Sequence, residues 1–389
     1  MFALSKQGLK AAVLAMMLAG SQAALAEDTV KVGMIVELTG PFAEFGHQME
    51  AGVKAYQAIH GDTVAGKKVE VIYKDVAGPN PDTAKRLAQE LVVRDKVQVL
   101  AGFGFTPNAM SVAPVATQAK VPMVVMNAAA GGLTGKSPYM VRTSFTYPDV
   151  VPPIAQWAME QGRKKAYVLV ADYAPGHDAE KAFVKAYEAA GGTIVGVTRT
   201  PIVTVDFSPY MARIRDAKPD LVFAFVNGGD VAPAMIKEYR ARKLEAEGIQ
   251  LIGTGDIVDE AIMNVIGEHG KGLVTVYPYS MHHDSDLNRQ YVKTFRAMQG
   301  AQTRPTIMSV AAYDGMALIY EALRKTGGKA DGQALLDAMK GMELESPRGP
   351  IRIDPETRDV VQSEYIRRFD QVNGEYANVE FKTYPAEKR

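Results

Sequence analysis

The feature that most constrains the fold is a repeated alternation of short apolar runs with segments of helical periodicity. In the first part of the chain the apolar runs cover residues 30–36, 68–73, 97–101 and 121–126. The alternation restarts near Tyr147 and Pro148, with runs at 166–171, 192–197, 220–226, 249–253 and 272–277. Such alternation is typical of βα units, which build a parallel sheet covered by helices. We therefore predict an α/β fold with two doubly wound parallel-sheet lobes.

The end of the chain departs from this alternation. Two helical segments, near 285–299 and 306–325, follow Pro278, and GPIRID and YIRRFDQV then predict antiparallel strands. No low-complexity linker separates the two halves, so we expect a hinge of several short crossovers rather than a flexible tether. At 389 residues the chain is also too long for one ordinary core.

The N-terminus has the pattern of a secretory signal peptide. Lys6 and Lys10 precede the apolar run AAVLAMMLA, and an Ala-x-Ala site ends at Ala26. The apolar run falls well short of the ~20 residues that a spanning helix needs, which disfavours a membrane anchor. We therefore expect residues 1–26 to be removed and the mature protein to be exported, without spanning the membrane.

Charge and cysteine content exclude several classes of protein. Lys plus Arg and Asp plus Glu both number 44, so the chain lacks the basic surplus of a nucleic-acid-binding protein. It has no cysteine, which rules out disulfides, thiolate metal sites, a cysteine nucleophile and a lipid-bearing cysteine. We therefore expect no nucleic-acid partner.

A candidate anion site lies in the stretch AGFGFTPNAM (101–110), directly after an apolar run. Thr106 followed by Pro107 is a helix-start signal, in which threonine caps the helix and proline takes its first position. The unpaired N–H groups of such a helix end carry partial positive charge and suit an anion. Open α/β sheets bind ligands beyond the carboxyl ends of their strands, so the loops there are candidate site segments.

The same loops contain no complete enzyme motif. Pro107 stands where a dinucleotide-binding Gly-x-Gly-x-x-Gly motif needs its third glycine, and neither a complete phosphate-loop motif nor a Gly-x-Ser-x-Gly elbow occurs. His282 and His283 have no third metal ligand at suitable spacing. Asp256 and Asp259 lie close together in the sequence, but turn and helix-cap roles explain them at least as well as a catalytic role does. We therefore expect no catalytic residues, no metal and no cofactor.

Aromatic residues gather on these loops. Phe42, Phe45, Phe103, Phe105 and Tyr173 lie on predicted loops or helix starts, where core packing explains them less easily. Rings beside helix N-termini suit a small ligand with an apolar body and an anionic end. The alternative is that each ring packs on the surface of its own lobe, and the sequence leaves both interpretations open.

Several stretches, in order between Val30 and about Tyr384, match the pattern of a known family. They are KVGMIVELTGPFAEFG, VQVLAGFGFTPNAMSVAPVA, VPMVVMNAAAGGLT, YVLVADYAPGHD and AAYDGMALIYEAL. The chain thereby resembles the branched-chain amino-acid-binding proteins of bacterial ABC importers, which have the type I periplasmic-binding fold.

The resemblance implies two lobes joined by three crossovers, with the ligand in the cleft between the lobes. The crossovers would lie near 144–147, 277–278 and 354–361. Lobe 1 would then comprise 28–146 and 278–355, and lobe 2 would comprise 147–277 and 356–389.

The resemblance also implies roles for individual residues. The ligand's carboxylate would bind the hydroxyl and N–H groups of the turn at Phe105 and Thr106, and an ammonium group would contact Asn127–Ala130 and Asp256. The candidate ligand-binding residues are Phe45, Phe103, Phe105, Thr106, Asn127, Ala128, Ala130, Tyr173, Pro175, Asn227, Gly228 and Asp256.

Three of these positions depart from the amino-acid binders. Phe45 and Pro175 stand where tyrosine is frequent, and Ala130 stands where a hydroxyl residue commonly holds the ammonium. Each change removes a hydrogen-bonding side chain, and a buried ammonium without partners is costly. The ligand is therefore a branched-chain amino acid or an aromatic or other amphipathic carboxylic acid, and Asp256 keeps the first alternative open.

The function implied by the resemblance is that of the solute-binding component of an ABC importer. It would deliver a small carboxylate to a membrane permease with its ATPase subunits, and it would not be an enzyme. Two alternatives from other classes are a secreted α/β hydrolase, for instance an amidase-like enzyme, and the sensor lobe of a receptor.

Overall fold

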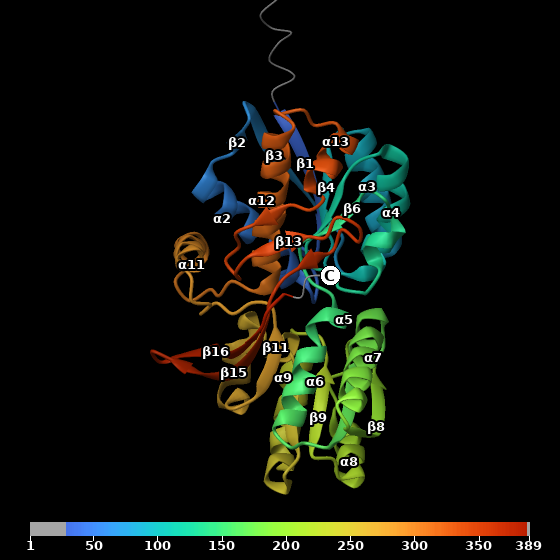
Figure 1. Cartoon of the computed structure of the whole chain (residues 1–389), viewed down its shortest axis with the longest axis vertical. Coiled ribbons are helices and arrows are strands. Elements are labelled where there is room, and N and C mark those ends of the chain that lie inside the picture. Colours follow the sequence, from blue (N-terminus) through green and yellow to red (C-terminus); the bar gives the residue numbers. More distant parts are fainter. Residues whose placement is uncertain (1–28, 387–389) are drawn as a thin grey trace, which may run out of the picture.

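The first sheet forms the upper body in Figure 1. The structure is a computed structural model that describes residues 29–386, so the predicted signal peptide lies outside the described residues. The strand order is β2-β3-β1-β4-β5-β6, and every neighbouring pair is parallel except β2 with β3. The strands are β1 (Thr29–Val36), β2 (Thr63–Val64), β3 (Lys67–Asp75), β4 (Val99–Gly102), β5 (Met123–Val125) and β6 (Met140–Arg142).

Helices cover both faces of this sheet. They are α2 (Ala43–His60), α3 (Pro81–Val93), α4 (Thr106–Ala119), and the later α11 (Asp286–Gln299), α12 (Ile307–Lys325) and α13 (Gly332–Met339). Alternate residues of β1 explain the two layers, because Met34 and Val36 pack with α2 and α12, whereas Ile35 packs with α3 and α4. We call this sheet with its helices lobe 1.

The second sheet forms the lower body in Figure 1 and has the strand order β16-β15-β11-β10-β9-β7-β8. Its strands are β7 (Lys165–Ala171), β8 (Thr193–Thr200), β9 (Leu221–Phe225), β10 (Gln250–Thr254), β11 (Val274–Tyr277), β15 (Glu364–Val372) and β16 (Glu375–Tyr384). The last two are antiparallel additions to a parallel sheet. This sheet and its helices form lobe 2, and the predicted two-lobed α/β fold is confirmed.

The helices of lobe 2 alternate with its strands as the sequence predicts. They are α5 (Tyr147–Val150), α6 (Pro152–Glu160), α7 (Ala174–Ala189), α8 (Ser208–Ala217), α9 (Val231–Ala241) and α10 (Met263–Ile266). The 3₁₀ turns of the described residues are Leu133–Lys136, Leu244–Glu247, Gly255–Val258, Glu260–Ile262 and Gly267–Gly270. Phe183 of α7 packs with Phe223 of β9 on one face, and Met235 of α9 packs with Val222 on the other.

The chain returns to lobe 1 after β11, because α11 and α12 pack against α2. A small third sheet of β12 (Glu343–Leu344), β13 (Ile351–Ile353) and β14 (Val360–Val361) follows. Since β14 pairs with β13, the chain re-enters lobe 2 only at β15, beyond the predicted boundary at residue 356. Asp359 also pairs with the buried Arg142 of β6, at 2.6 Å between Oδ1 and Nη2.

Helix starts mostly follow the sequence signals. Asn80 caps α3 by accepting from Thr83 N–H at 3.1 Å, as the Asn-Pro signal predicts. The expectation that Thr106 caps α4 was wrong: Thr106 is the first helical residue, Phe105 takes the cap position, and no side chain caps the helix. The Thr106 hydroxyl is therefore not used by the helix. Within residues 29–386 no helix is both long and apolar enough to cross a bilayer.

Candidate ligand-binding site

A cavity of about 220 Å³ lies between the two lobes, at the carboxyl ends of strands from both sheets. Lobe 1 contributes the segments around α2 and α4 and the loop after β5, and lobe 2 contributes the loops after β7, β9 and β10. The lining residues are Pro41, Phe42, Glu44, Phe45, Gln48, Gly104, Phe105, Thr106, Asn127, Ala128, Ala129, Phe145, Tyr147, Tyr173, Pro175, Asn227, Gly228, Gly229, Asp256, Asp259, Ala261, Ile262, Thr306 and Met308.

The lobe 1 wall of the cavity carries a phenylalanine cluster, made of Phe42, Phe45 and Phe105. The Phe45 and Phe105 rings are stacked with centroids 5.5 Å apart, and Phe42 meets Phe105 edge-on at 4.9 Å. Ring contacts of this kind hold aromatic side chains in defined orientations and leave their remaining faces for a ligand. This wall favours the flat apolar body of a ligand.

Beside the cluster, the start of α4 presents hydrogen-bond donors to the cavity. Thr106 is buried, and its Oγ1 has no hydrogen-bond partner among the described residues. Asn127 Nδ2 donates to the carbonyl oxygen of Gly104 at 2.8 Å, which fixes the preceding turn to the loop after β5. A free hydroxyl beside unpaired N–H groups at a helix start is a suitable site for a carboxylate.

The lobe 2 wall is built around Asp256, which follows β10. Tyr147 Oη donates to Asp256 at 3.1 Å from Oδ2, and Tyr277 Oη donates to Oδ1 at 3.1 Å. Burial raises the pKa of Asp256, and the hydrogen bonds from the two tyrosines partly oppose that rise. Burial, with the nearby Asp256 charge, also raises the pKa values of both tyrosines, so their hydroxyls remain protonated donors.

Asn227, which follows β9, lies next to Asp256 on this wall. Tyr173 Oη donates to Asn227 Oδ1 at 2.8 Å, while Asn227 Nδ2 is buried without a hydrogen-bond partner among the described residues. A Cβ atom on Gly228 would lie 3.9 Å from the Asp256 carbonyl oxygen, so the two loops are in contact. This end of the cavity therefore combines a hydrogen-bond acceptor with a free donor.

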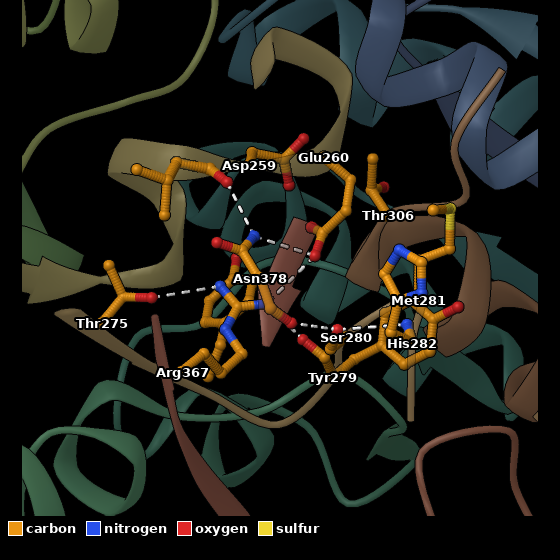
Figure 2. Close-up of polar contacts among 12 residues, drawn as sticks. Asp259, Glu260, Thr275, Tyr279, Ser280, Met281, His282, Thr306, Arg367 and Asn378 are labelled. Carbon is orange, nitrogen blue, oxygen red and sulfur yellow. Dashed lines mark hydrogen bonds and ion pairs between the residues drawn. The ribbon is translucent and has the colours of Figure 1, made fainter. Parts of the chain in front are cut away.

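A buried ion pair supports the lobe 2 wall from behind (Figure 2). Arg367 Nη1 lies 3.1 Å from Glu260 Oε1, and Asn378 Nδ2 donates to the same oxygen at 3.0 Å. The Arg367 guanidinium also donates to the Tyr279 carbonyl oxygen and lies 5.0 Å from the centroid of the Tyr277 ring. The network thus joins the cavity loop, the crossover after β11 and the β15–β16 hairpin.

Asp259 lies between this network and the cavity. Its Oδ1 accepts from Ala261 N–H at 3.0 Å, whereas its buried Oδ2 has no hydrogen-bond partner among the described residues. Burial, followed by the charges of Glu260 and Asp256, raises the pKa of Asp259 well above its usual value. Both effects favour the protonated, uncharged form of Asp259.

Most predicted site residues line the cavity. They are Phe45, Phe105, Thr106, Asn127, Ala128, Tyr173, Pro175, Asn227, Gly228 and Asp256. Phe103 and Ala130 do not. The Phe103 ring is fully buried in the core between the first sheet and α3 and α4, and its φ of 71° turns the chain toward Gly104. The Ala130 carbonyl accepts from Arg142 Nη1 at 2.8 Å and faces away from the cavity, which Ala129 lines instead.

The sequence prediction missed the tyrosine hydroxyls that hold Asp256. Tyr147 and Tyr277 were both placed in predicted crossovers, and Tyr277 also at the end of a strand, but neither was named as a site residue. A tyrosine at a crossover is a usable signal, since the crossovers border the cavity. Gln48, Thr306 and Met308 line the cavity from helices whose place in the tertiary structure the sequence did not fix.

The described residues contain no group of three or more His, Asp or Glu side chains that could hold a metal ion. His283 instead contacts Glu380 through Nδ1 at 2.9 Å, and His282 donates through its backbone N–H to Ser280 Oγ. The cavity is thus a binding site formed by rings, free donors and one hydrogen-bonded carboxyl.

Two α/β lobes around one shared cavity define a two-lobed ligand-binding protein. The chain belongs to the periplasmic binding protein family, whose model matches residues 29–375. It is 46% identical to Leu/Ile/Val-binding protein homolog 6 of Brucella melitensis, over 92% of each chain. The resemblance to solute-binding proteins that the sequence predicts is therefore confirmed, and nothing in these comparisons supports a secreted hydrolase.

Solved structures of ABC-transporter solute-binding proteins are similar to the whole described chain. One from Rhodopseudomonas palustris BisB5, in complex with 3,4-dihydroxybenzoic acid, is 50% identical with a TM-score of 0.89, covering 93% of this chain and 99% of that one. Another from Rhodopseudomonas palustris HaA2, in complex with p-hydroxybenzoic acid, is 45% identical with a TM-score of 0.90, covering 93% and 98%.

Proposed function

We propose that this protein binds an aromatic carboxylate of the hydroxybenzoate kind in the cavity between its lobes. We further propose that it is the periplasmic component of an ABC importer and delivers this ligand to a membrane permease and its ATPase subunits. In this role the protein binds and releases its ligand unchanged and is not an enzyme.

The observation that carries the proposal is the pair of unlike groups at the lobe 2 end. Asp256 offers an acceptor there, and Asn227 Nδ2 offers a donor that has no partner within residues 29–386. A ligand hydroxyl can donate to the first and accept from the second, whereas an ammonium group can only donate. A buried donor left unpaired costs about 1–3 kcal/mol, which disfavours an ammonium at this position.

The opposite end suits the carboxylate of the same ligand. Thr106 Oγ1 has no hydrogen-bond partner among the described residues and no side chain caps α4, so this helix start matches an anion. The ring would then lie against Phe45 and Phe105, whose stacked pair covers the middle of the cavity. Each buried apolar contact adds favourable burial free energy at roughly 25 cal/mol per Å².

The relatives support the same ligand class. Two similar solute-binding proteins from Rhodopseudomonas palustris, 50% and 45% identical to this chain, hold hydroxylated benzoic acids. The name of the Brucella relative favours a branched-chain amino acid instead, and Asp256 is the residue that would serve it. The two ligand classes are therefore the alternatives that the experiment must separate.

The test is calorimetric titration of the purified mature protein, refolded from denaturant to remove bound ligand. We expect 4-hydroxybenzoate and 3,4-dihydroxybenzoate to bind more tightly than benzoate, and leucine and valine to bind at least ~100-fold more weakly. Tighter binding of leucine than of any aromatic acid would overturn the proposed ligand class. Chromatography of the ligand after long incubation should recover it unchanged, and a hydrolysed or otherwise altered product would contradict a binding role.

A further inference from the structure

A buried acid lies directly behind the proposed carboxylate-binding turn. Glu37 follows β1 and is fully buried, with an exposed fraction of 0%. A Cβ atom on residue 104 would overlap Glu37 Oε2, so only glycine lets the turn rest on this carboxyl group. Gly104 and Thr106 line the cavity on the other side of the same turn. One thin segment of backbone therefore separates Glu37 from the site of the ligand's carboxylate.

The contacts of Glu37 hold two elements to this turn. Asn108, in the first turn of α4, donates through Nδ2 to Glu37 Oε1 at 3.3 Å and to the Gly78 carbonyl oxygen at 3.0 Å. The N–H of Gly46, in α2, donates to the Glu37 carbonyl oxygen at 3.0 Å. The second carboxyl oxygen, Oε2, has no hydrogen-bond partner among the described residues.

The charges around Glu37 disfavour its ionised form. No Lys or Arg side chain of residues 29–386 forms an ion pair with it, and Asp75, at the end of β3, repels a negative charge there. Burial is the largest effect and raises the pKa of Glu37 to about 8, while hydrogen bonding with the backbone and with Asn108 partly opposes the rise. Glu44, the other acid near this wall, is exposed to solvent in the first turn of α2.

We propose that Glu37 is a positioning residue that supports the Gly104–Thr106 turn as an uncharged carboxylic acid, and that the ligand's carboxylate binds only while Glu37 carries its proton. The inference rests on the proposed function, because it requires an anion at Thr106. An ionised Glu37 and a bound carboxylate would compete for the positive end of one helix, α4, across a single turn of backbone.

The direction of the pH dependence follows from linkage. A bound anion raises the pKa of Glu37 above its value in the free protein, so binding takes up a proton when the pH exceeds that value. Below about pH 7 Glu37 is protonated in both states, and the affinity does not depend on it. Above about pH 8 the affinity of the wild type should fall, by up to about tenfold per pH unit.

The experiment compares the wild type with Glu37→Gln, which keeps the shape of the side chain but cannot ionise. Calorimetry with 4-hydroxybenzoate from about pH 7 to about pH 9.5 should give similar affinities at pH 7 and a growing advantage of the variant above about pH 8. Titration of the ligand or of other residues affects both proteins equally, so its effect cancels in the ratio of the two affinities. Glu70→Gln, at an exposed position of β3 outside the cavity lining, is the matched control and should show the same pH profile as the wild type.

A second measurement needs no variant. Titrations of the wild type near pH 8.5, in buffers with different ionisation enthalpies, should reveal uptake of a fraction of a proton on binding. A flat affinity ratio together with no proton uptake would overturn the role of Glu37 while leaving the proposed function intact. A wild type that fails to bind 4-hydroxybenzoate at pH 7 would overturn the proposed function and this inference with it.

Discussion

The two walls of the cavity differ in chemistry and in what lies behind them. The lobe 1 wall consists of the phenylalanine cluster and the free Thr106 hydroxyl, and the uncharged acid Glu37 lies behind it. The lobe 2 wall consists of hydrogen-bonded polar groups around Asp256, and the ion pair of Arg367 with Glu260 lies behind it. The first wall leaves the Thr106 hydroxyl free, whereas on the second wall Asp256 already accepts hydrogen bonds from two tyrosines.

This difference indicates how the ligand is oriented. A free hydroxyl at a helix start favours the charged end of the ligand, because the hydroxyl otherwise has no hydrogen-bond partner. A carboxyl that already accepts from two tyrosines needs only one further polar partner, such as a ligand hydroxyl. The two lobes thus hold opposite ends of one molecule, and neither lobe alone offers both.

The largest expected effect concerns the support of the lobe 2 wall. Arg367→Met leaves Glu260 as a buried charge without its partner, so the free energy of unfolding should fall by about 3–5 kcal/mol. Chemical denaturation followed by circular dichroism measures this change. Arg368→Met is the matched control, since the neighbouring Arg368 is exposed and lies over Phe381; it should change stability little. Equal stability of both variants would show that the ion pair does not hold this wall.

An intermediate effect is expected at the lobe 1 wall. Thr106→Val removes the free hydroxyl but keeps the shape of the side chain, so the affinity for 4-hydroxybenzoate should fall by about 1–3 kcal/mol. The free energy of unfolding should stay the same or rise slightly, because Thr106 Oγ1 has no hydrogen-bond partner in the described part of the chain. Calorimetry and thermal unfolding separate the two quantities, with Thr106→Ser as the control that restores binding. Unchanged affinity would place the ligand's carboxylate elsewhere.

The smallest expected effect is at Asp256. Asp256→Asn keeps a hydrogen-bond acceptor for the tyrosines and for a ligand hydroxyl, so the affinity for 4-hydroxybenzoate should change by no more than about 1 kcal/mol. If the natural ligand carried an ammonium, the same change would cost about 2–5 kcal/mol, because a desolvated charge would lose its partner. Calorimetry with the tightest ligand from the screen distinguishes the two cases, and a loss in the larger range would restore the amino-acid interpretation.

The sequence predicts the fold better than it predicts the short elements. The long strands and helices were evident because their apolar residues repeat with the period of each structure, as in β1 and α12. Short strands such as β6 and β14 escaped prediction, since two or three residues carry no periodicity and form only through pairing with neighbours. The sequence also did not predict that the chain re-enters lobe 2 only at β15. This position depends on the pairing of β14 with β13.

Thr106 and Asp256 line the cavity as the sequence predicts, because strand ends and the loops after them determine these positions. Phe103 was misplaced because adjacent residues of a turn point to opposite sides of the sheet, and no pattern shows which ring enters the core. Glu37 and the Tyr147 hydroxyl depend on tertiary contacts with residues far along the chain, namely Gly104 and Asp256. Such partners are visible only in the folded structure.

The central claim is that the two walls hold opposite ends of one aromatic acid, and a crystal structure with bound 4-hydroxybenzoate tests it most directly. We predict a carboxylate oxygen within about 2.5–3.0 Å of Thr106 Oγ1, and the phenolic oxygen within hydrogen-bonding distance of Asp256 and Asn227. A ligand bound in the reverse orientation, with its carboxylate toward Asp256, or bound outside the cavity, would contradict the account.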